Sequence, residues 1–146
     1  SLSRTCSSIH DALWISKATW MLDDKPKHWV GPHNQDPPRL IQEVSILFPP
    51  TMIQSVRVCC MWRDQGWGNR KSRLFVSTNR DQLSHDSIVV QSDIAEHDER
   101  PLELEFKTKA DVKYYVWCRV GGGGGHQLFV RELRVEYVLW DLPNLH

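Results

Sequence analysis

Leu102-Glu103-Leu104-Glu105-Phe106-Lys107 alternates apolar and charged side chains without a break. Successive side chains of a β-strand point to opposite faces of its sheet, so this alternation predicts a strand with one face on a core and the other in water. A helix of the same sequence would not separate the apolar from the charged residues. The segment therefore favours a β-sheet protein.

The same period of two recurs along the chain and predicts its strands. We expect them at residues 13–20, 40–48, 54–63, 73–77, 87–94, 102–107, 113–120 and 127–140. The segments between them are rich in Gly, Pro, Asn and Asp, which favour turns. About eight short strands separated by such turns predict an all-β fold, a single antiparallel β-sandwich of the jelly-roll type.

The side-chain parity of these runs predicts the core. In the final run Leu128 and Val130 share one parity, whereas Val135 and Tyr137 share the other. One extra residue near Arg131-Glu132 would produce this switch, and we expect a β-bulge or a tight corner there. The residues expected in the core are Val56, Val58, Trp62, Leu102, Leu104, Phe106, Val135 and Tyr137.

Length and charge limit the classes of partner. The 146 residues suit one domain, 1–146, and the chain begins at Ser1 without a methionine, so we expect a domain excised from a longer protein. Lysine plus arginine number 18 and aspartate plus glutamate also number 18, which leaves no net field to attract nucleic acid. The longest apolar runs fall far short of the roughly 20 residues that span a bilayer. We therefore expect no nucleic-acid partner and no membrane insertion.

The cysteines indicate a reducing compartment. Cys6, Cys59, Cys60 and Cys118 form no C-x-x-C pair, and the adjacent Cys59 and Cys60 should point to opposite faces of one strand. This geometry disfavours a disulfide between the two, so we expect free thiols. The N-terminus also lacks the apolar core of a signal peptide, and we expect a cytoplasmic location.

A polar loop with glycine hinges follows the expected strand at 54–63. It contains Arg63-Asp64-Gln65-Gly66-Trp67-Gly68-Asn69-Arg70-Lys71, which joins one tryptophan to several hydrogen-bonding side chains. A tryptophan face can stack on the apolar side of a sugar, while Asp64 and Asn69 can bond vicinal hydroxyls. The pattern predicts a recognition loop for a sugar, a peptide or another protein. In the alternative interpretation the loop is a structural hairpin, with Trp67 folded back onto the sandwich and Asp64 paired with Arg63 or Arg70.

A run of five glycines, Gly121 to Gly125, precedes His126 and the final expected strand. The run lacks the Lys-Ser/Thr ending and the following helix of a phosphate-binding P-loop, so we expect a flexible loop, either a mobile tip or a lid that contacts ligand. The strands at 54–63 and 113–120 lead into the tryptophan loop and the glycine run. If both strands run toward the same pole, Trp67 and His126 lie in one cleft.

Metal ligands and catalytic residues form no recognisable pattern. The seven histidines are scattered, and no pair has the spacing of a zinc site. Asp23-Asp24 and residues 33–36 could supply oxygens to calcium, although both segments also suit solvated turns. A glycoside hydrolase would need Asp64 and a second carboxylate. We expect no metal, no cofactor and no enzymatic activity, with a calcium site and a hydrolase as alternatives.

The C-terminal part of the chain resembles a known family. Its long final strand, Phe129-Val130-Arg131-Glu132-Leu133-Arg134-Val135-Glu136-Tyr137, follows Tyr115-Val116-Trp117-Cys118-Arg119-Val120 and the glycine run. This arrangement resembles the galactose-binding-like jelly rolls, the superfamily of discoidin-type and F-box-associated domains, and as architecture the resemblance covers most of the chain. In the F-box-associated branch a loop bearing tyrosine and tryptophan precedes the last strand at the comparable position. The glycan-contacting aromatic residues of the sugar-binding members have no counterpart here, because the glycine run stands in their place.

Together these patterns predict a non-enzymatic recognition module that binds a carbohydrate or glycoconjugate through loops at one end of the sandwich. A protein–protein interaction domain that recruits a partner within a larger intracellular protein is the main alternative. The residues expected to contact the ligand are Arg63, Asp64, Trp67, Asn69 and His126.

Overall fold

A computed structural model of the chain describes residues 2–6, 14–33 and 35–140, with side chains from residue 16 onward. Both ends of the expected domain 1–146 lie outside these ranges, as do the first residue of the run 13–20 and Asn34 of the possible calcium segment. The side chain of Cys6 is also outside the described part.

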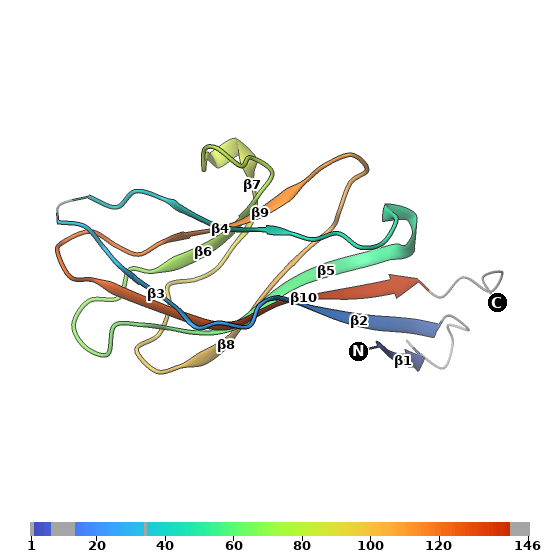
Figure 1. The fold of residues 1–146 in the computed structure, drawn as a ribbon, viewed down its shortest axis with the longest axis horizontal. Helices are drawn as coiled ribbons and strands as arrows, with labels where there is room; N and C mark the ends of the chain where they lie inside the picture. Colours follow the sequence, from blue (N-terminus) through green and yellow to red (C-terminus); the bar gives the residue numbers. More distant parts are fainter. Residues whose placement is uncertain (1, 7–13, 34, 141–146) are drawn as a thin grey trace.

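The described residues form two antiparallel sheets. Sheet A has six strands, with β3 beside β10 and the others in the order β1-β2-β10-β5-β8: β1 (Leu2–Cys6), β2 (Trp14–Asp23), β3 (Lys27–Val30), β5 (Ile53–Asp64), β8 (Arg100–Phe106) and β10 (Gln127–Trp140). Sheet B has four strands in the order β4-β9-β6-β7: β4 (Arg39–Val44), β6 (Arg73–Ser77), β7 (Ile88–Gln91) and β9 (Tyr114–Arg119). Figure 1 shows the sheets as two layers.

The chain crosses between the layers at six of the nine connections between described strands. From β3 onward every connection crosses except the one between β6 and β7, which are neighbours in sheet B. Two antiparallel sheets packed around one core form a β-sandwich, so the predicted all-β sandwich is confirmed. The only helical segments in the described ranges are two 3-10 turns, Pro50–Met52 and His85–Ser87, and neither has the length or apolar character to cross a membrane.

The predicted strands agree closely with those observed, apart from two additions. The runs 73–77 and 127–140 coincide with β6 and β10, and the other six differ from their observed strands only at their ends. The sequence pattern does not predict β1 or β3. β3 has only four residues, and it forms because β10 extends past the end of β2 and needs a partner there: residues 127–130 of β10 pair with β3, and residues 133–140 pair with β2.

The predicted bulge lies in β10. The register with β5 shifts between Arg131 and Arg134, and Glu132 between them has φ 56°, which is uncommon for a residue other than glycine. This insertion allows both Leu128 and Val135 to face the core although their parities differ. The prediction of a bulge at Arg131-Glu132 is confirmed.

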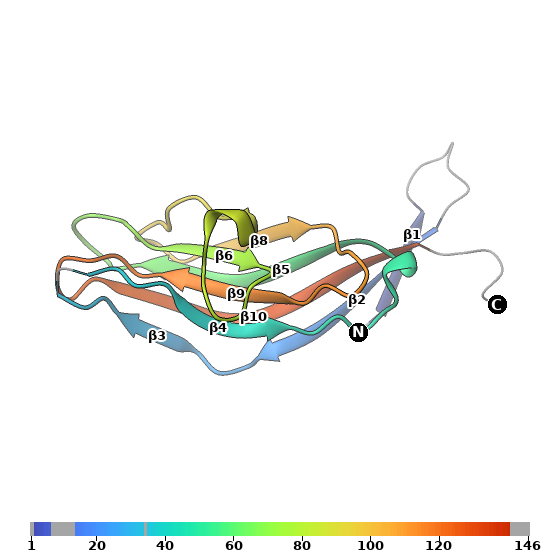
Figure 2. The same ribbon diagram turned by 90° about the horizontal axis from the view of Figure 1, so that it is seen from above.

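The core lies between the two sheets. Of the eight residues predicted for it, seven are buried in one contiguous cluster, and the eighth, Leu102, is partly buried against that cluster. A smaller cluster covers the outer face of sheet B, where Leu83 packs with Phe75, Tyr115 and Trp117. Figure 2 shows the segment between β6 and β7, which carries Leu83, crossing over that sheet.

Three cysteines are buried free thiols. Cys60 and Cys118 belong to the core cluster, whereas Cys59 points to the other face of β5. Burial raises the pKa of each of these thiols to about 12, so all three stay protonated at neutral pH. The prediction of free thiols is confirmed for these three residues.

Candidate functional site

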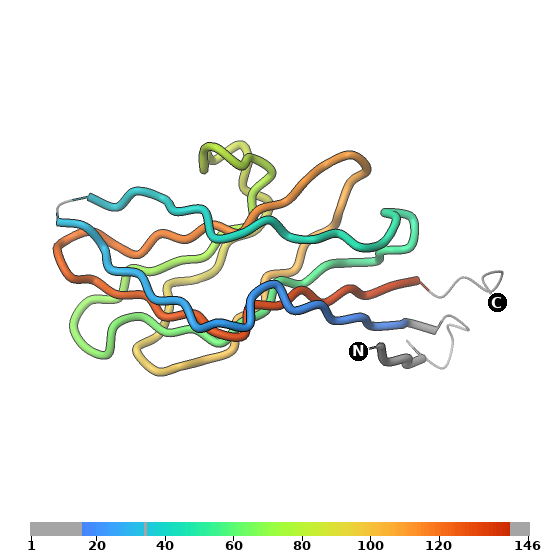
Figure 3. The backbone as a smooth tube through the Cα atoms, viewed as in Figure 1, coloured from blue at the N-terminus to red at the C-terminus, as the bar shows by residue number. Residues whose placement is uncertain are grey.

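The tryptophan loop (residues 65–72) and the glycine loop (residues 120–126) lie side by side at one end of the sandwich. β5 and β9, which lead into them, belong to different sheets and run toward the same pole (Figures 1 and 3). Between the loops is a cleft of about 340 Å³. Its lining consists of Gln65, Trp67, Gly68, Asn69, Lys71, residues 122–125 and His126. The prediction that Trp67 and His126 share one cleft is confirmed.

The base of the tryptophan loop is held by the carboxylate of Asp64. One carboxylate oxygen, Oδ1, accepts a hydrogen bond from the backbone N–H of Gln65 at 2.7 Å. The other, Oδ2, accepts bonds from the backbone N–H groups of Lys71 and Ser72, both at 2.9 Å. Asp64 therefore closes the loop by tying its first residue to its last two, and its side chain has no exposed surface.

His126 joins this anchor from the glycine loop. Its Nε2 lies 2.8 Å from Oδ1 of Asp64, in an approach that is not aligned as a hydrogen bond. Its backbone carbonyl accepts a bond of 2.6 Å from the N–H of Gly31, which follows β3. His126 is 5% exposed, so most of its ring packs inside the protein and only its margin reaches the cleft.

Two further bonds connect the loops directly. Nζ of Lys71 donates to the carbonyl of Gly122 at 3.0 Å, and Oγ of Ser72 donates to the carbonyl of Val120 at 2.8 Å. Each donor belongs to the tryptophan loop and each acceptor to the glycine loop. The two walls of the cleft are therefore held in one arrangement relative to each other.

The glycine loop packs closely against the segment that follows β3. A Cβ atom on Gly31 would lie 2.0 Å from the carbonyl oxygen of Gly121, so a side chain there would force the two backbones apart. Gly121 has φ 111°, a conformation that other residues rarely adopt, and its N–H donates to Oδ1 of Asp36 at 2.9 Å. The close approach of the two backbones therefore explains why glycine stands at positions 31 and 121. The sequence alone suggested only that the glycine run is a flexible loop.

Trp67 stands out from the tip of its loop. Its side chain is 78% exposed, the largest value among the exposed large apolar residues of the described part. The loop below it is closed by a 2.9 Å bond from Nε2 of Gln65 to the carbonyl of Asn69, with Gly68 at φ 76°. The alternative in which Trp67 folds back onto the sandwich does not occur.

The same alternative paired Asp64 with Arg63 or Arg70, and the structure shows other partners for the Asp64 carboxylate. Asp64 contacts His126 and backbone amides, while Arg70 pairs with Glu96 at 2.7 Å. The segment containing Glu96 supports the loop from its other side, because the carbonyl of Glu96 accepts a 2.7 Å bond from the N–H of Asp64. His97, the next residue, places Nδ1 2.5 Å from the carbonyl of Gln65.

The five residues expected to contact ligand therefore occupy three kinds of position. Trp67, Asn69 and His126 line the cleft, and Asp64 lies beneath it as the anchor. Arg63 lies on the outer face of sheet A, where its guanidinium Cζ is 3.8 Å from the centre of the Phe129 ring. Strand parity gives the reason, because Asp64 shares the parity of the core residue Trp62, whereas Arg63 has the opposite parity.

Sequence reasoning missed three residues that shape the site: Lys71, Gly31 and Asp36. Lys71 lies near the end of the tryptophan loop, and it is 51 residues from Gly122 in the sequence, so no local pattern indicates their contact. Gly31 and Asp36 belong to the segment Gly31-Pro32-His33-Asn34-Gln35-Asp36-Pro37-Pro38, whose composition is that of a turn. Their role depends on β3, which the sequence pattern does not reveal.

The possible calcium segments make other contacts. Asp23 pairs with Nζ of Lys27 at 2.6 Å and accepts the N–H of Lys25 at 2.9 Å, and these bonds lower its pKa below the ordinary value. Asp36 accepts the bond from Gly121 described above. Across the described residues, no three His, Cys, Asp or Glu side chains come together as a metal site.

Comparison with known proteins gives no relative for this chain. No protein-family model matches it, and searches of curated proteins and of solved structures returned no similar protein. The function is therefore argued from the geometry of the cleft.

Proposed function

We propose that the protein is a non-enzymatic recognition module that binds a carbohydrate or glycoconjugate in the cleft between the tryptophan and glycine loops. The observation that carries this proposal is Trp67, whose indole is 78% exposed beside a lining that is otherwise mostly polar or glycine. An exposed indole next to hydrogen-bonding groups suits a ligand with one apolar face and many hydroxyls, which is the character of a sugar ring.

The polar lining complements that platform. Gln65, Asn69 and Lys71 offer donors and acceptors on one wall, and the backbone groups of residues 122–125 do so on the other. Glycine exposes its N–H and C=O without side-chain obstruction, so hydroxyl groups can approach closely. Nζ of Lys71 uses one of its three donors in the bond to the carbonyl of Gly122, so it can also donate to a ligand hydroxyl.

Several features favour binding over hydrolysis. The lining described above contains no carboxylate, whereas glycoside hydrolysis ordinarily uses two carboxyl groups that flank the scissile bond. Asp64 is fully buried, and both of its oxygens are engaged by backbone amides or by His126. The volume of about 340 Å³ is at the lower end of ligand sites and suits a short glycan of one or two rings.

A glycan array with the wild-type protein and the Trp67→Ala variant tests this proposal. We expect specific glycan signals for the wild type and at least about a tenfold loss in the variant, because an indole contributes both apolar burial and ring stacking. Trp20→Ala is the matched control, since Trp20 is also exposed, at 51%, but lies on β2 outside the cleft. It should retain the wild-type signals.

Three results would contradict parts of the proposal. Equal glycan signals in the wild type and Trp67→Ala would place the site elsewhere. A protein partner that is pulled down by the wild type and lost in Trp67→Ala, with no glycan signal, would favour the protein-interaction alternative. Turnover of a glycoside by the purified wild-type protein would overturn the non-enzymatic assignment.

A further inference from the structure

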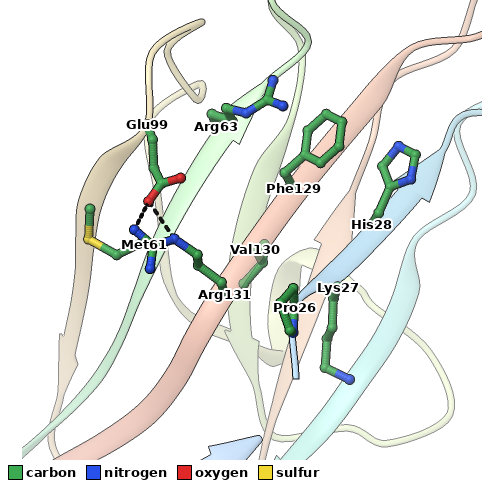
Figure 4. Close-up of a pocket in the computed structure, with 9 residues that line it drawn as sticks. All are labelled: Pro26, Lys27, His28, Met61, Arg63, Glu99, Phe129, Val130 and Arg131. Carbon is green, nitrogen blue, oxygen red and sulfur yellow. Dashed lines mark hydrogen bonds and ion pairs between the residues drawn. The ribbon is translucent and has the colours of Figure 1, made fainter. Parts of the chain in front are cut away.

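The outer face of sheet A contains a second hollow, of about 220 Å³, which shares no lining residue with the cleft between the loops. Figure 4 shows it over β10, with β5 on one side and the start of β3 on the other. The side chains that matter here are Met61 and Arg63 from β5, Phe129 and Arg131 from β10, His28 from β3, and Glu99.

Strand register arranges four of these side chains as a rectangle. Arg63 pairs with Phe129 and Met61 pairs with Arg131, and within each strand the two residues are separated by one position. All four therefore point to the same face of the sheet. The two guanidinium groups stand on one diagonal of the rectangle, and the two apolar side chains stand on the other.

Phe129 holds Arg63 in place. The guanidinium Cζ of Arg63 is 3.8 Å from the ring centre. The ring of His28 stacks on Phe129 as well, with 4.3 Å between ring centres and 8° between planes, and Figure 4 shows Phe129 between the two. A guanidinium that stacks on a ring keeps its in-plane N–H groups available, and Arg63 uses one of its five donors in a 3.4 Å bond to the carbonyl of Asp64.

The second guanidinium already holds a carboxylate. Nε of Arg131 donates to Oε1 of Glu99 at 2.6 Å, and its NH2 group contacts the same oxygen. Its remaining contact is with Glu132 at 3.0 Å. Arg63, by contrast, has no carboxylate partner among the side chains that the structure describes. Of the two guanidinium groups in the rectangle, that of Arg131 pairs with a carboxylate and that of Arg63 does not, among the described side chains.

The walls of the hollow suit a ligand whose carboxylate reaches Arg63 and whose remaining part is apolar. Met61 and Pro26 line it with apolar surface, and Phe129 has both faces near His28 and Arg63, which leaves its edge toward the hollow. The edge of an aromatic ring carries the positive part of its quadrupole and favours a negative neighbour. Apolar walls and a guanidinium at one side are complementary to a small amphipathic anion.

We propose that this hollow is a binding site for a small organic carboxylate that bears a flat apolar group. Arg63 binds the carboxylate with its free in-plane N–H groups, and the apolar group lies against Met61 and the edge of Phe129. The site is independent of the proposed glycan cleft, because the two linings have no residue in common.

The probe for this site is 3-phenylpropionate, compared with its neutral amide in titrations of the ¹⁵N-labelled protein followed by NMR. We expect the acid to bind with a dissociation constant on the order of 1 mM, as suits a ligand of this size, and to shift the amide signals of Arg63, Phe129 and Arg131. The amide should bind at least about fivefold more weakly, because it cannot form charge-assisted bonds with Arg63.

Two substitutions separate the roles of the charges. Arg63→Gln should weaken binding of the acid by at least about fivefold, whereas Glu99→Gln should strengthen it about twofold or more, because Arg131 then becomes available to the ligand. Arg57→Gln is the control, since Arg57 lies on the same face of β5 but pairs with Glu103 and Glu105 outside the hollow. It should leave binding unchanged.

Equal affinity for the acid and the amide in the wild-type protein would overturn the proposal, and this comparison needs no variant to fold. Shifts confined to Trp67 and residues 122–125 would also overturn it, since the acid would then occupy the other cleft. Unchanged binding in a folded Arg63→Gln protein would exclude Arg63 as the carboxylate ligand. None of these results bears on the glycan array, so the two proposals fail separately.

Discussion

The two walls of the cleft are held in different ways. The backbone of the tryptophan loop is held without bonds from the glycine loop, because Asp64 bonds the N–H groups at both ends of the loop, Gln65 bonds the carbonyl of Asn69 and Arg70 pairs with Glu96. The glycine loop is held by other segments, through bonds from Gly121 to Asp36 and from Lys71 to Gly122. The backbone of the tryptophan loop therefore does not depend on the glycine loop, whereas the glycine loop depends on the tryptophan loop and on Asp36.

This difference implies that the glycine loop depends on the tryptophan loop, and that both loops depend on Asp64. Asp64 positions the backbone of Lys71 and Ser72, and these two residues then hold the glycine loop. Loss of the Asp64 anchor should therefore disturb both walls, whereas loss of a single contact to the glycine loop should disturb only that wall. Three substitutions with decreasing expected effects test this order.

The largest effect is expected for Asp64→Asn. An amide in place of the carboxylate directs N–H groups toward backbone donors that now bond an oxygen, and it removes the negative charge beside His126. A buried anchor with several bonds of this kind is worth about 2–4 kcal/mol of unfolding free energy. Urea unfolding at pH 7 measures the change, with Asp98→Asn, an exposed carboxylate, as the control.

The buried thiols give a second readout for the same variant. With a pKa of about 12, Cys59, Cys60 and Cys118 should react slowly with a disulfide reagent at pH 8 as long as the sandwich stays closed. A loss of 2 kcal/mol or more should speed their labelling by roughly 30-fold if opening is global. Labelling that stays at the wild-type rate, with wild-type urea stability, would show that the loop does not depend on Asp64.

A smaller loss is expected for Gly31→Ala. The new Cβ would lie 2.0 Å from the carbonyl oxygen of Gly121, so the glycine loop has to move away from the segment after β3. Forced overpacking of this kind costs about 1–3 kcal/mol. Gly66→Ala is the matched control, because a Cβ on Gly66 meets no atom within 4 Å.

Thermal unfolding of the two glycine variants gives the comparison. Gly66→Ala should melt within about 2 °C of the wild type, whereas Gly31→Ala should melt several degrees lower. Equal melting temperatures would mean that the close approach of Gly31 and Gly121 contributes nothing to the stability of the protein.

The sequence predicts the parts of this molecule that depend on local alternation. The period of two identifies eight strands and most of the core, and the parity switch locates the bulge at Glu132, because a pleat requires these patterns within one strand. It does not reveal β3, whose four residues become a strand only beside the overhanging end of β10. Such pairing depends on tertiary context rather than on the propensity of the segment.

The candidate site, like the fold, was predictable only where it depends on local sequence pattern and strand direction. The polar loop follows from composition, and the meeting of the two loops follows from the directions of β5 and β9, whereas the sequence leaves open whether Trp67 stands out or folds back. The roles of Arg63 and Asp64 are encoded in strand parity, since only the even positions of β5 between Val56 and Asp64 face inward toward the core. Treating the strand as ended at Arg63 hides that signal, and both residues are then read as parts of one loop.

The smallest effect on stability is expected for Lys71→Met, which removes the bond from Nζ to the carbonyl of Gly122 and keeps the apolar stem. One exposed bond of this kind is worth at most about 1 kcal/mol, so the melting temperature should change little. The local effect should be larger, because the glycine loop loses a contact that its own residues cannot replace. Amide hydrogen exchange at residues 122–125 should therefore become faster, while exchange at residues 65–69 stays as in the wild type. Lys113→Met, an exposed lysine outside the cleft, is the control and should leave both sets unchanged. Equal acceleration of both loops would show that the tryptophan loop also depends on the glycine loop, which would contradict a dependence that runs in one direction only.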